Sequence, residues 1–291
     1  MLKNKGISSF SSQSGQALLI VVLVMVIALT VGLSVISRTV TNLRTSTEQA
    51  SSQKALAAAE AGIEQAIEKN IVGGAPPVTG NFTSGATSYS TEVTETSNTQ
   101  SLLNGGNVVP KDQGVDIWLS PYSADPITLW TSPWTGNLVV YWGTSSDVCT
   151  NDSSNTMAAL EIVVVSGSTS SPSTTRYAYD SCTSGVNRQS SNNFSKVSPS
   201  SNTIAGDTFN YSVSVPIVQG FLARVVPLYA GSLIAVAGQD ASNNPQSLPA
   251  QGKTIVSTGK SDNGTTQRKV AVFESYPELP SELFPFTIFS P

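Results

Sequence analysis

The side chains that most often carry out acid–base or nucleophilic chemistry are scarce in this sequence. Its 291 residues contain no His and only two Cys, Cys149 and Cys182. Without His there can be no Ser–His or Cys–His nucleophile pair, and the commonest protein metal ligand is missing. No Gly-rich phosphate loop, Gly-x-Ser-x-Gly elbow or Cys-x-x-Cys pair occurs either. The residue inventory therefore predicts a protein that is not an enzyme and that uses no cofactor or metal.

Carboxylates are the remaining candidates for catalysis or metal binding. Asp112, Asp116 and Asp125 could meet in space, but any β domain has such acids, and a catalytic dyad is disfavoured. Three glutamates recur every fourth residue and would share one helix face: Glu60, Glu64 and Glu68. Like charges at that spacing repel weakly, which favours a solvated face over a metal or partner site.

The two cysteines and a group of aromatic residues are the other side chains with a candidate role. A Cys149–Cys182 disulfide would staple a surface-exposed loop and would place the domain in an oxidising compartment. The alternative is a pair of buried free thiols. Six aromatic residues lie close together in the sequence: Trp118, Tyr122, Trp130, Trp134, Tyr141 and Trp142. They could form a sugar-binding or surface-binding face, but core and loop packing is favoured.

The composition limits the classes of partner. Charged residues make up 12% of the chain and the net charge is −4, so nothing favours binding to a nucleic-acid backbone. Ser and Thr are abundant, and Gly and Pro are spread throughout. This composition is typical of an extracellular β domain with long loops.

A long helix near the amino terminus must organise everything that follows. No charge occurs between Lys5 and Arg38. Twenty helical residues rise about 30 Å, the thickness of the hydrocarbon core of a bilayer, so residues 17–36 predict a transmembrane half. Good helix formers continue to Asn70, where Gly and Pro residues begin. We predict one helix over 16–70. Its amphipathic second half would dock the downstream domain through an apolar stripe of Leu56, Ala59, Ile63, Ala66 and Ile67.

The first 70 residues resemble the amino terminus of type IV pilins, most closely minor pilins of the PilX type. A short basic leader ends at Gly15, the hydrophobic helix begins at Gln16, and an Ala-rich amphipathic half follows. The resemblance implies that a prepilin peptidase cuts between Gly15 and Gln16. It also implies that the helix first anchors the subunit in the inner membrane and later packs in a filament core. Gln16 stands where the family usually has Phe or Met. Ile20 stands where it has Glu, which favours a minor or tip subunit over a shaft subunit.

Beyond the helix the sequence predicts a linker and then β structure. Residues 71–87 are rich in Gly and Pro and should form the linker, and 88–291 should form a β-rich globular domain. The expected strands are 88–95, 115–119, 137–142, 159–165, 174–179, 208–215, 221–228, 232–237, 253–257 and 268–275. Residues 161–165 should be the most buried strand, Pro216 and Pro227 should mark strand ends or edges, and 181–202 should be a long exposed loop. Asp262-Asn263-Gly264 should form a turn, and the proline-broken tail after Tyr276 should pack across the domain.

The predicted fold class is α+β: a long amino-terminal helix, transmembrane in its first half, followed by a mainly antiparallel extracellular domain. The expected function is that of a minor pilin that primes assembly or presents an adhesive surface. Its expected partners are other pilin subunits, the pilus assembly machinery, a prepilin peptidase and the inner membrane, but no nucleic acid. Within the membrane, helices would associate through small residues such as Gly32. The alternative is an uncleaved, single-pass, signal-anchored surface protein with a β-rich binding domain.

Overall fold

The computed structural model describes residues 14–82, 87–123, 131–182, 188–262 and 264–280. Its fold is the predicted one, a long amino-terminal helix followed by a β-rich, mainly antiparallel part. The chain divides into two compact units. Unit 1 comprises Met1–Gly62, Thr79–Ser90 and Ser257–Val270, and unit 2 comprises Ile63–Val78, Thr91–Val256 and Ala271–Pro291. The predicted leader lies outside the described residues as far as residue 13.

Helix α1 spans Ser14–Glu68, 55 residues, close to the predicted 16–70. It ends where Asn70 adopts a left-handed conformation, with φ at 45°. The Asn70 N–H donates to the Ile67 carbonyl at 2.9 Å, and the Ile71 N–H donates to the Ala66 carbonyl at 3.0 Å. This pair of bonds is the Schellman arrangement, in which Asn is one of the few residues that tolerate the left-handed position. The helix stop predicted at Asn70 is therefore confirmed.

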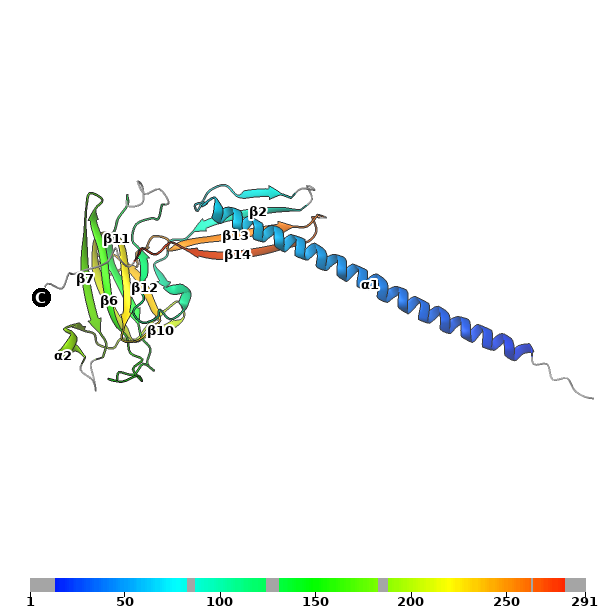
Figure 1. The fold of residues 1–291 in the computed structure, drawn as a ribbon, viewed down its shortest axis with the longest axis horizontal. Coiled ribbons are helices and arrows are strands. Elements are labelled where there is room, and N and C mark those ends of the chain that lie inside the picture. The colour runs from blue at the N-terminus through cyan, green and yellow to red at the C-terminus, as the bar shows by residue number, and fades with distance from the viewer. Residues whose placement is uncertain (1–13, 83–86, 124–130, 183–187, 263, 281–291) are drawn as a thin grey trace, which may run out of the picture. The chain divides into compact units, whose positions relative to one another are not determined.

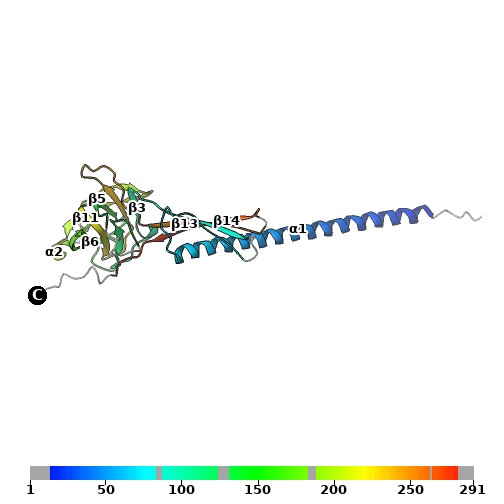
Figure 2. The ribbon, with the colours of Figure 1, turned by 90° about the horizontal axis from the view of Figure 1, so that it is seen from above.

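In unit 1 the earlier part of α1 stands alone. No strand of that unit lies beside its blue amino-terminal portion in either view (Figures 1 and 2). Every described side chain from residue 17 to residue 50 is exposed. Only the later part of the helix runs beside strands. The four-stranded sheet has the order β1-β2-β13-β14, and its strands contain residues of both units. Its strands are β1 (Val78–Asn81), β2 (Ser88–Glu95), β13 (Gly252–Lys260) and β14 (Gln267–Ser275). Because β1 lies within 71–87, the predicted linker is shorter than expected.

Unit 2 contains a larger, bent sheet with the order β3-β12-β5-β11-β6-β7-β8, and β4 pairs with β11 outside that path (Figure 1). Its strands are β3 (Gln100–Leu102), β4 (Val115–Trp118), β5 (Trp134–Trp142), β6 (Ala159–Ser168), β7 (Ser171–Asp180), β8 (Ser195–Lys196), β11 (Tyr211–Leu228) and β12 (Ile234–Gln239). A separate hairpin joins β9 (Asn202–Ile204) to β10 (Asp207–Phe209), and two short helical turns complete the unit, η1 (Asn104–Gly106) and α2 (Gln189–Asn192). All pairs in the large sheet are antiparallel except β7 with β8.

Strand β11 shapes this sheet because its two halves pair differently. Its first half pairs with β5, from Tyr211 opposite Trp142 to Ile217. Its second half pairs with β6 and β4, after a register shift between Ile217 and Gly220. The bulge bends the strand, so the inward side chains of both halves face one core.

The prediction that Pro216 and Pro227 mark strand ends or edges is confirmed for Pro227, which is one residue before the end of β11. Pro216 marks no strand end, because β11 runs through both of the strands predicted at 208–215 and 221–228. Pro216 pairs with β5 near the bulge, and Pro227 pairs with β6 beyond the last residue that pairs with β4. Each proline has one strand partner in the described sheet. A missing N–H is tolerated at a position with an open side.

The core is built mainly from alternating side chains of β4, β5, β6, β11 and β12. Residues 161–165 are not the most buried strand segment, because Glu161 and Val165 are only half-buried. The five residues 138–142 of β5 are all buried. The reason is a second apolar cluster in which Phe209 and Ile204 of the β9–β10 hairpin pack with Val139 and Tyr141, and so cover the other face of β5.

Candidate functional site

The apolar half of α1 is the most unusual surface of the molecule. Its large apolar side chains from Leu18 to Ile36 are each between 53% and 70% exposed. The helix is long and apolar enough to cross a membrane. Two of its hydroxyl groups bond within the helix: Thr30 Oγ1 donates to the Ile27 carbonyl at 2.8 Å, and Thr39 Oγ1 donates to the Val35 carbonyl at 2.9 Å. These threonines can therefore enter lipid or a helix bundle with their hydroxyl groups bonded, as the backbone of a helix is.

The predicted processing and packing residues lie on this helix. Gly15 and Gln16 belong to the first turns of α1, and the surroundings of their side chains are outside the described structure. Gly32 is exposed, and a Cβ added there would meet nothing within 4 Å. Gly32 therefore has no packing role inside this chain, and a role between subunits stays a prediction.

The later part of α1 is buried on a stripe of small residues that differs from the predicted one. Ala55, Ala58 and Ala59 are at most 1% exposed, whereas the predicted stripe residues Leu56 and Ile67 are 41% and 43% exposed. The other predicted residues, Ala59, Ile63 and Ala66, are buried. The buried set repeats at helical spacing through Ala55, Ala58, Ala59, Gly62, Ile63 and Ala66, so the period is as expected but the face is rotated.

The physical reason for this rotation is a close approach of helix and strand backbones in unit 1. A Cβ added at Gly259 of β13 would overlap the Ala55 carbonyl oxygen and would lie 2.6 Å from the backbone nitrogen of Ala59. Only small side chains fit at such a contact, so Ala is favoured on the inner face and Leu56 faces outward. The Ala-rich run at residues 57–61 is the sequence signal that could have indicated this close contact.

Polar contacts hold the loop after β13 to the same part of α1. Asp262 forms an ion pair with Lys54 at 2.6 Å and a hydrogen bond with Thr87. Arg268 Nε donates to Ser52 Oγ at 2.8 Å. Hydrogen bonds from Lys54 and then Thr87 lower the pKa of Asp262. The predicted turn begins at Asp262, and its central residue, Asn263, lies outside the described residues.

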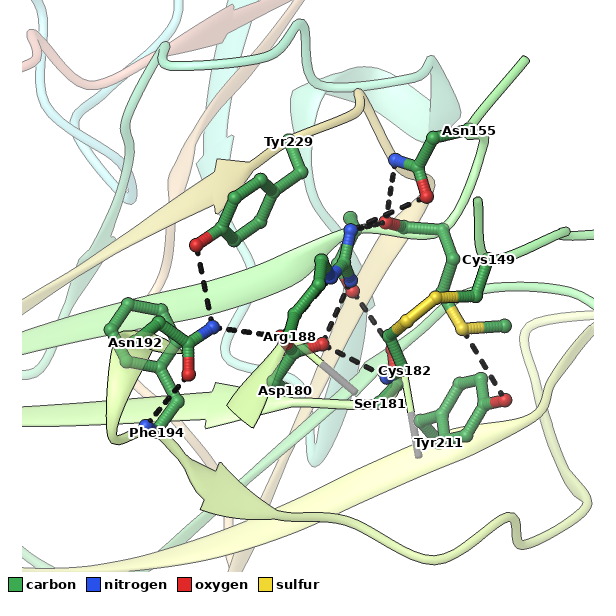
Figure 3. Close-up of polar contacts among 12 residues, drawn as sticks. Cys149, Asn155, Asp180, Ser181, Cys182, Arg188, Asn192, Phe194, Tyr211 and Tyr229 are labelled. Carbon is green, nitrogen blue, oxygen red and sulfur yellow. Dashed lines mark hydrogen bonds and ion pairs between the residues drawn. A yellow bond between two sulfur atoms is a disulfide. The ribbon is translucent and has the colours of Figure 1, made fainter. Parts of the chain in front are cut away.

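A cluster of loops in unit 2 surrounds the two cysteines, which are bonded to each other (Figure 3). Their Cα atoms are 5.6 Å apart and their sequence separation is 33 residues. Cys182 is fully buried, and its N–H donates to Asp180 Oδ1 at 2.9 Å. The disulfide therefore joins a fully buried cysteine to the half-buried Cys149, whose neighbour Val148 is exposed.

Beside the disulfide lies a buried ion pair that sequence reasoning missed. Arg188 Nη2 donates to Asp180 Oδ1 at 2.8 Å, and Arg188 Nε donates to Asp180 Oδ2 at 3.2 Å. Arg188 Nη1 donates to Asn155 Oδ1 at 3.3 Å and to the Met157 carbonyl at 3.1 Å. Asp180 is fully buried and Arg188 is 8% exposed. The pair thus joins the end of β7, the loop before β6 and the segment after Cys182.

Tyr229 covers this ion pair at the surface (Figure 3). The Arg188 guanidinium carbon lies 4.3 Å from the centre of the Tyr229 ring. Asn192 Nδ2 donates to the Tyr229 hydroxyl at 3.3 Å and to Asp180 Oδ2 at 2.9 Å. Tyr229 is 42% exposed and has a φ of 71°, which is uncommon for a bulky residue. The segment predicted as one long exposed loop, 181–202, therefore contains α2, β8 and several buried residues.

The acidic residues that were candidates for catalysis or metal binding do not come together in the described part of the chain. The Asp116 carboxylate accepts two hydrogen bonds from Arg224, at 2.7 and 2.8 Å, and one from the Leu279 N–H at 2.7 Å. Asp112 is exposed. Asp125 and Trp130 lie outside the described residues. No three acidic, His or Cys side chains of the described chain are grouped so that they could hold a metal ion. Glu60, Glu64 and Glu68 are exposed, the solvated arrangement that was favoured.

Most of the aromatic group packs in the interior. Trp118, Trp134, Tyr141 and Trp142 are between 0% and 8% exposed. Trp118 meets Tyr122 edge-on, and Tyr122 stacks on Tyr276 with ring centres 4.4 Å apart. Core packing was the favoured interpretation, and these buried rings offer no continuous sugar-binding face.

Comparisons of the chain with family models, with curated proteins and with solved structures gave no match in any of the three. The resemblance to type IV pilins therefore stays an expectation based on the first 70 residues.

Proposed function

We propose that this chain is a non-catalytic, minor-pilin-like subunit of a type IV pilus-like filament. It is made as a single-pass precursor in the cytoplasmic membrane of a bacterium. A prepilin peptidase cuts it between Gly15 and Gln16, and the assembly machinery then inserts α1 into the filament among the helices of other pilin subunits. The β-rich part stays outside, where it primes assembly or presents an adhesive surface.

The observation that carries this proposal is the division of α1 into two surfaces. Residues 17–50 are exposed throughout, and the apolar half contains no charged residue before Arg38. The later residues are buried on the Ala stripe. Burying the free apolar half in lipid or among other helices stabilises it by on the order of tens of kcal/mol, at about 25 cal/mol per Å². Since both environments bury the same surface, transfer from the membrane into a filament costs little free energy.

The absence of an acid early in the helix supports a minor position. The first acidic residue of the described helix is Glu48, and Ile20 is at the place where pilins of the shaft carry Glu. A subunit without that carboxylate has no charge to pair with the amino terminus of a neighbour. A tip or priming subunit, which need not stack below another subunit, does not need it.

The loop cluster around the disulfide supports an exposed position for unit 2. Cys149–Cys182 and the Arg188–Asp180 pair fix the loop backbones, while the surrounding loops expose mainly Ser, Asn and Thr. Rigid loops with adaptable polar side chains are typical of recognition surfaces. Such a disulfide persists only outside a reducing cytoplasm.

The test is to follow Gly15→Val in cells of the native host that carry pili. We expect Gly15→Val to block processing, so that the protein stays in the membrane fraction and is missing from sheared filaments. The matched control is Gly32→Ala, which should be processed normally. Incorporation of Gly15→Val at the wild-type level would refute the proposal. If the wild-type chain itself stays uncleaved in the membrane, the chain is a signal-anchored surface protein.

A further inference from the structure

A buried lysine in unit 2 has no part in the proposed function. Lys253 of β13 is 5% exposed, although lysine is almost never buried without a partner. Its Nζ donates to Asn70 Oδ1 at 3.1 Å and lies 3.3 Å from Glu274 Oε2 on β14. An amine, a primary carboxamide and a carboxyl group therefore meet at one point. These are the three groups needed to form an amide bond between two side chains.

We infer that Lys253 and Asn70 form an intramolecular isopeptide bond, with Glu274 as the proton carrier. Lys253 Nζ attacks Cγ of Asn70, and the new C–N bond replaces the bond between Cγ and the amide nitrogen of Asn70, which leaves as ammonia. The Glu274 carboxylate takes one proton from the Nζ ammonium before the attack and gives it to the departing nitrogen. It then takes the second proton that Nζ loses, so that Glu274 ends protonated. Atoms and charge balance without an oxidant or a co-reactant.

The burial of Lys253 favours this chemistry, while Asn70 is exposed and the Glu274 side chain is 38% exposed. Glu274 Oε2 is buried, and no hydrogen-bond donor in the described part of the chain is aligned with it. Removing the Lys253 ammonium from water costs several kcal/mol. Transfer of a proton from Lys253 to Glu274 relieves that cost and leaves a neutral amine, which is the nucleophilic form.

Geometry and surroundings also suit the reaction. Asn70 is the left-handed residue that ends α1, so its backbone is fixed by two hydrogen bonds. Nζ is held 3.1 Å from Oδ1 of Asn70, which is bonded to Cγ, the atom that Nζ attacks. A small cavity of about 60 Å³ is lined by Asn70, Lys253, Glu274 and Tyr276, and it is large enough for water or ammonia.

The consequence is a covalent link between the end of α1 and the sheet. Residue 70 lies two positions after the last residue of the helix, Glu68, and Lys253 is the second residue of β13. In a filament subunit, a pulling force enters through the helix, and this bond would carry the force past the non-covalent contacts. The inference itself does not depend on whether the chain forms filaments.

The test is mass spectrometry of the purified full-length chain, reduced and digested with trypsin. We expect a branched peptide in which 70–111 is joined to 225–260, with trypsin unable to cut after Lys253. Its mass should be about 17 Da below the sum of the two peptides, the mass of one ammonia. Recovery of 70–111 and 225–253 as separate peptides in full yield would overturn the inference.

Variants identify the role of each group. Lys253→Arg and Glu274→Gln should abolish the branched peptide, and Lys260→Arg, which changes an exposed lysine on the same strand, should keep it. Asn70→Asp should still give the bond but lose water, about 18 Da, in place of ammonia. A branched peptide that persists in Glu274→Gln would contradict the role of that carboxyl group. If a variant does not fold, the wild-type digest still decides.

Discussion

The buried ion pair of Arg188 and Asp180 is hydrogen-bonded to the loops that surround it. Asp180 has no exposed surface, and it accepts hydrogen bonds from Arg188, Asn192 and the Cys182 N–H. Arg188 in turn donates to Asn155. In a chain that is 12% charged, each buried ion pair fixes a particular set of loops. The Asp116–Arg224 pair does the same for the Leu279 backbone.

Removal of Arg188 should therefore be costly. Arg188→Leu leaves the Asp180 carboxylate buried without its cation, and we expect a loss of about 3–5 kcal/mol in the free energy of unfolding of unit 2. Arg176→Leu is the matched control, because Arg176 pairs with Glu161 at a partly exposed site. It should cost at most about 1 kcal/mol. Urea unfolding followed by tryptophan fluorescence measures both; equal losses would contradict the role assigned to the buried pair.

A second prediction concerns Gly259 of β13. A methyl group at this position would overlap the backbone of α1, so Gly259→Ala should destabilise unit 1 by about 1–3 kcal/mol. Gly32→Ala is the control, since its added methyl meets nothing, and it should leave the helix unchanged or slightly more stable. Hydrogen exchange of the amides of residues 52–62 reports the difference. Unchanged protection in Gly259→Ala would mean that helix and strand are not in backbone contact.

At the scale of elements, the long helix could be predicted almost to the residue because its signals agree. A charge-free run, an Ala-rich continuation and an Asn that tolerates the left-handed position all indicate the same helix. Most strands were also predictable from β-branched and aromatic residues. The continuity of strand β11 was not, because a bulge at Ile217–Gly220 lets one strand pair with two partners, and Pro216 therefore marks no strand end. The buried ion pairs, and the choice of which face of the Ala-rich run is buried, depend on tertiary contacts that no local pattern records.

The loop after β13 gives a prediction about pH. Hydrogen bonds from Lys54 and Thr87 lower the pKa of Asp262 below its ordinary value of 3.8. A lowered pKa contributes stability that is present above the ordinary value and is lost as the pH falls through the lowered one. The amides of the helix turn around Lys54 should therefore lose protection in that acid window. Asp262→Asn should remove this pH dependence of exchange; if the acid dependence is the same as in the wild type, the Lys54–Asp262 pair is not formed in solution.

At the scale of the whole molecule, one helix joins two environments. Its first half has an apolar surface with no partner in the described chain, and its second half is packed on small residues beside β13. Its end lies at the Asn70–Lys253–Glu274 cluster, and the disulfide-bonded loops belong to unit 2. A subunit that is anchored by its helix and presents a stapled β domain accounts for all of these features.

The most direct test of this account is the amino-terminal residue of the protein purified from its own host, determined by intact mass and sequencing of the terminal peptide. The account predicts a start at Gln16 with the apolar helix retained. A start at Met1 would contradict it and indicate a signal-anchored surface protein. A start beyond Ser37 would contradict it as well, because the helix would then have served only as a signal for secretion.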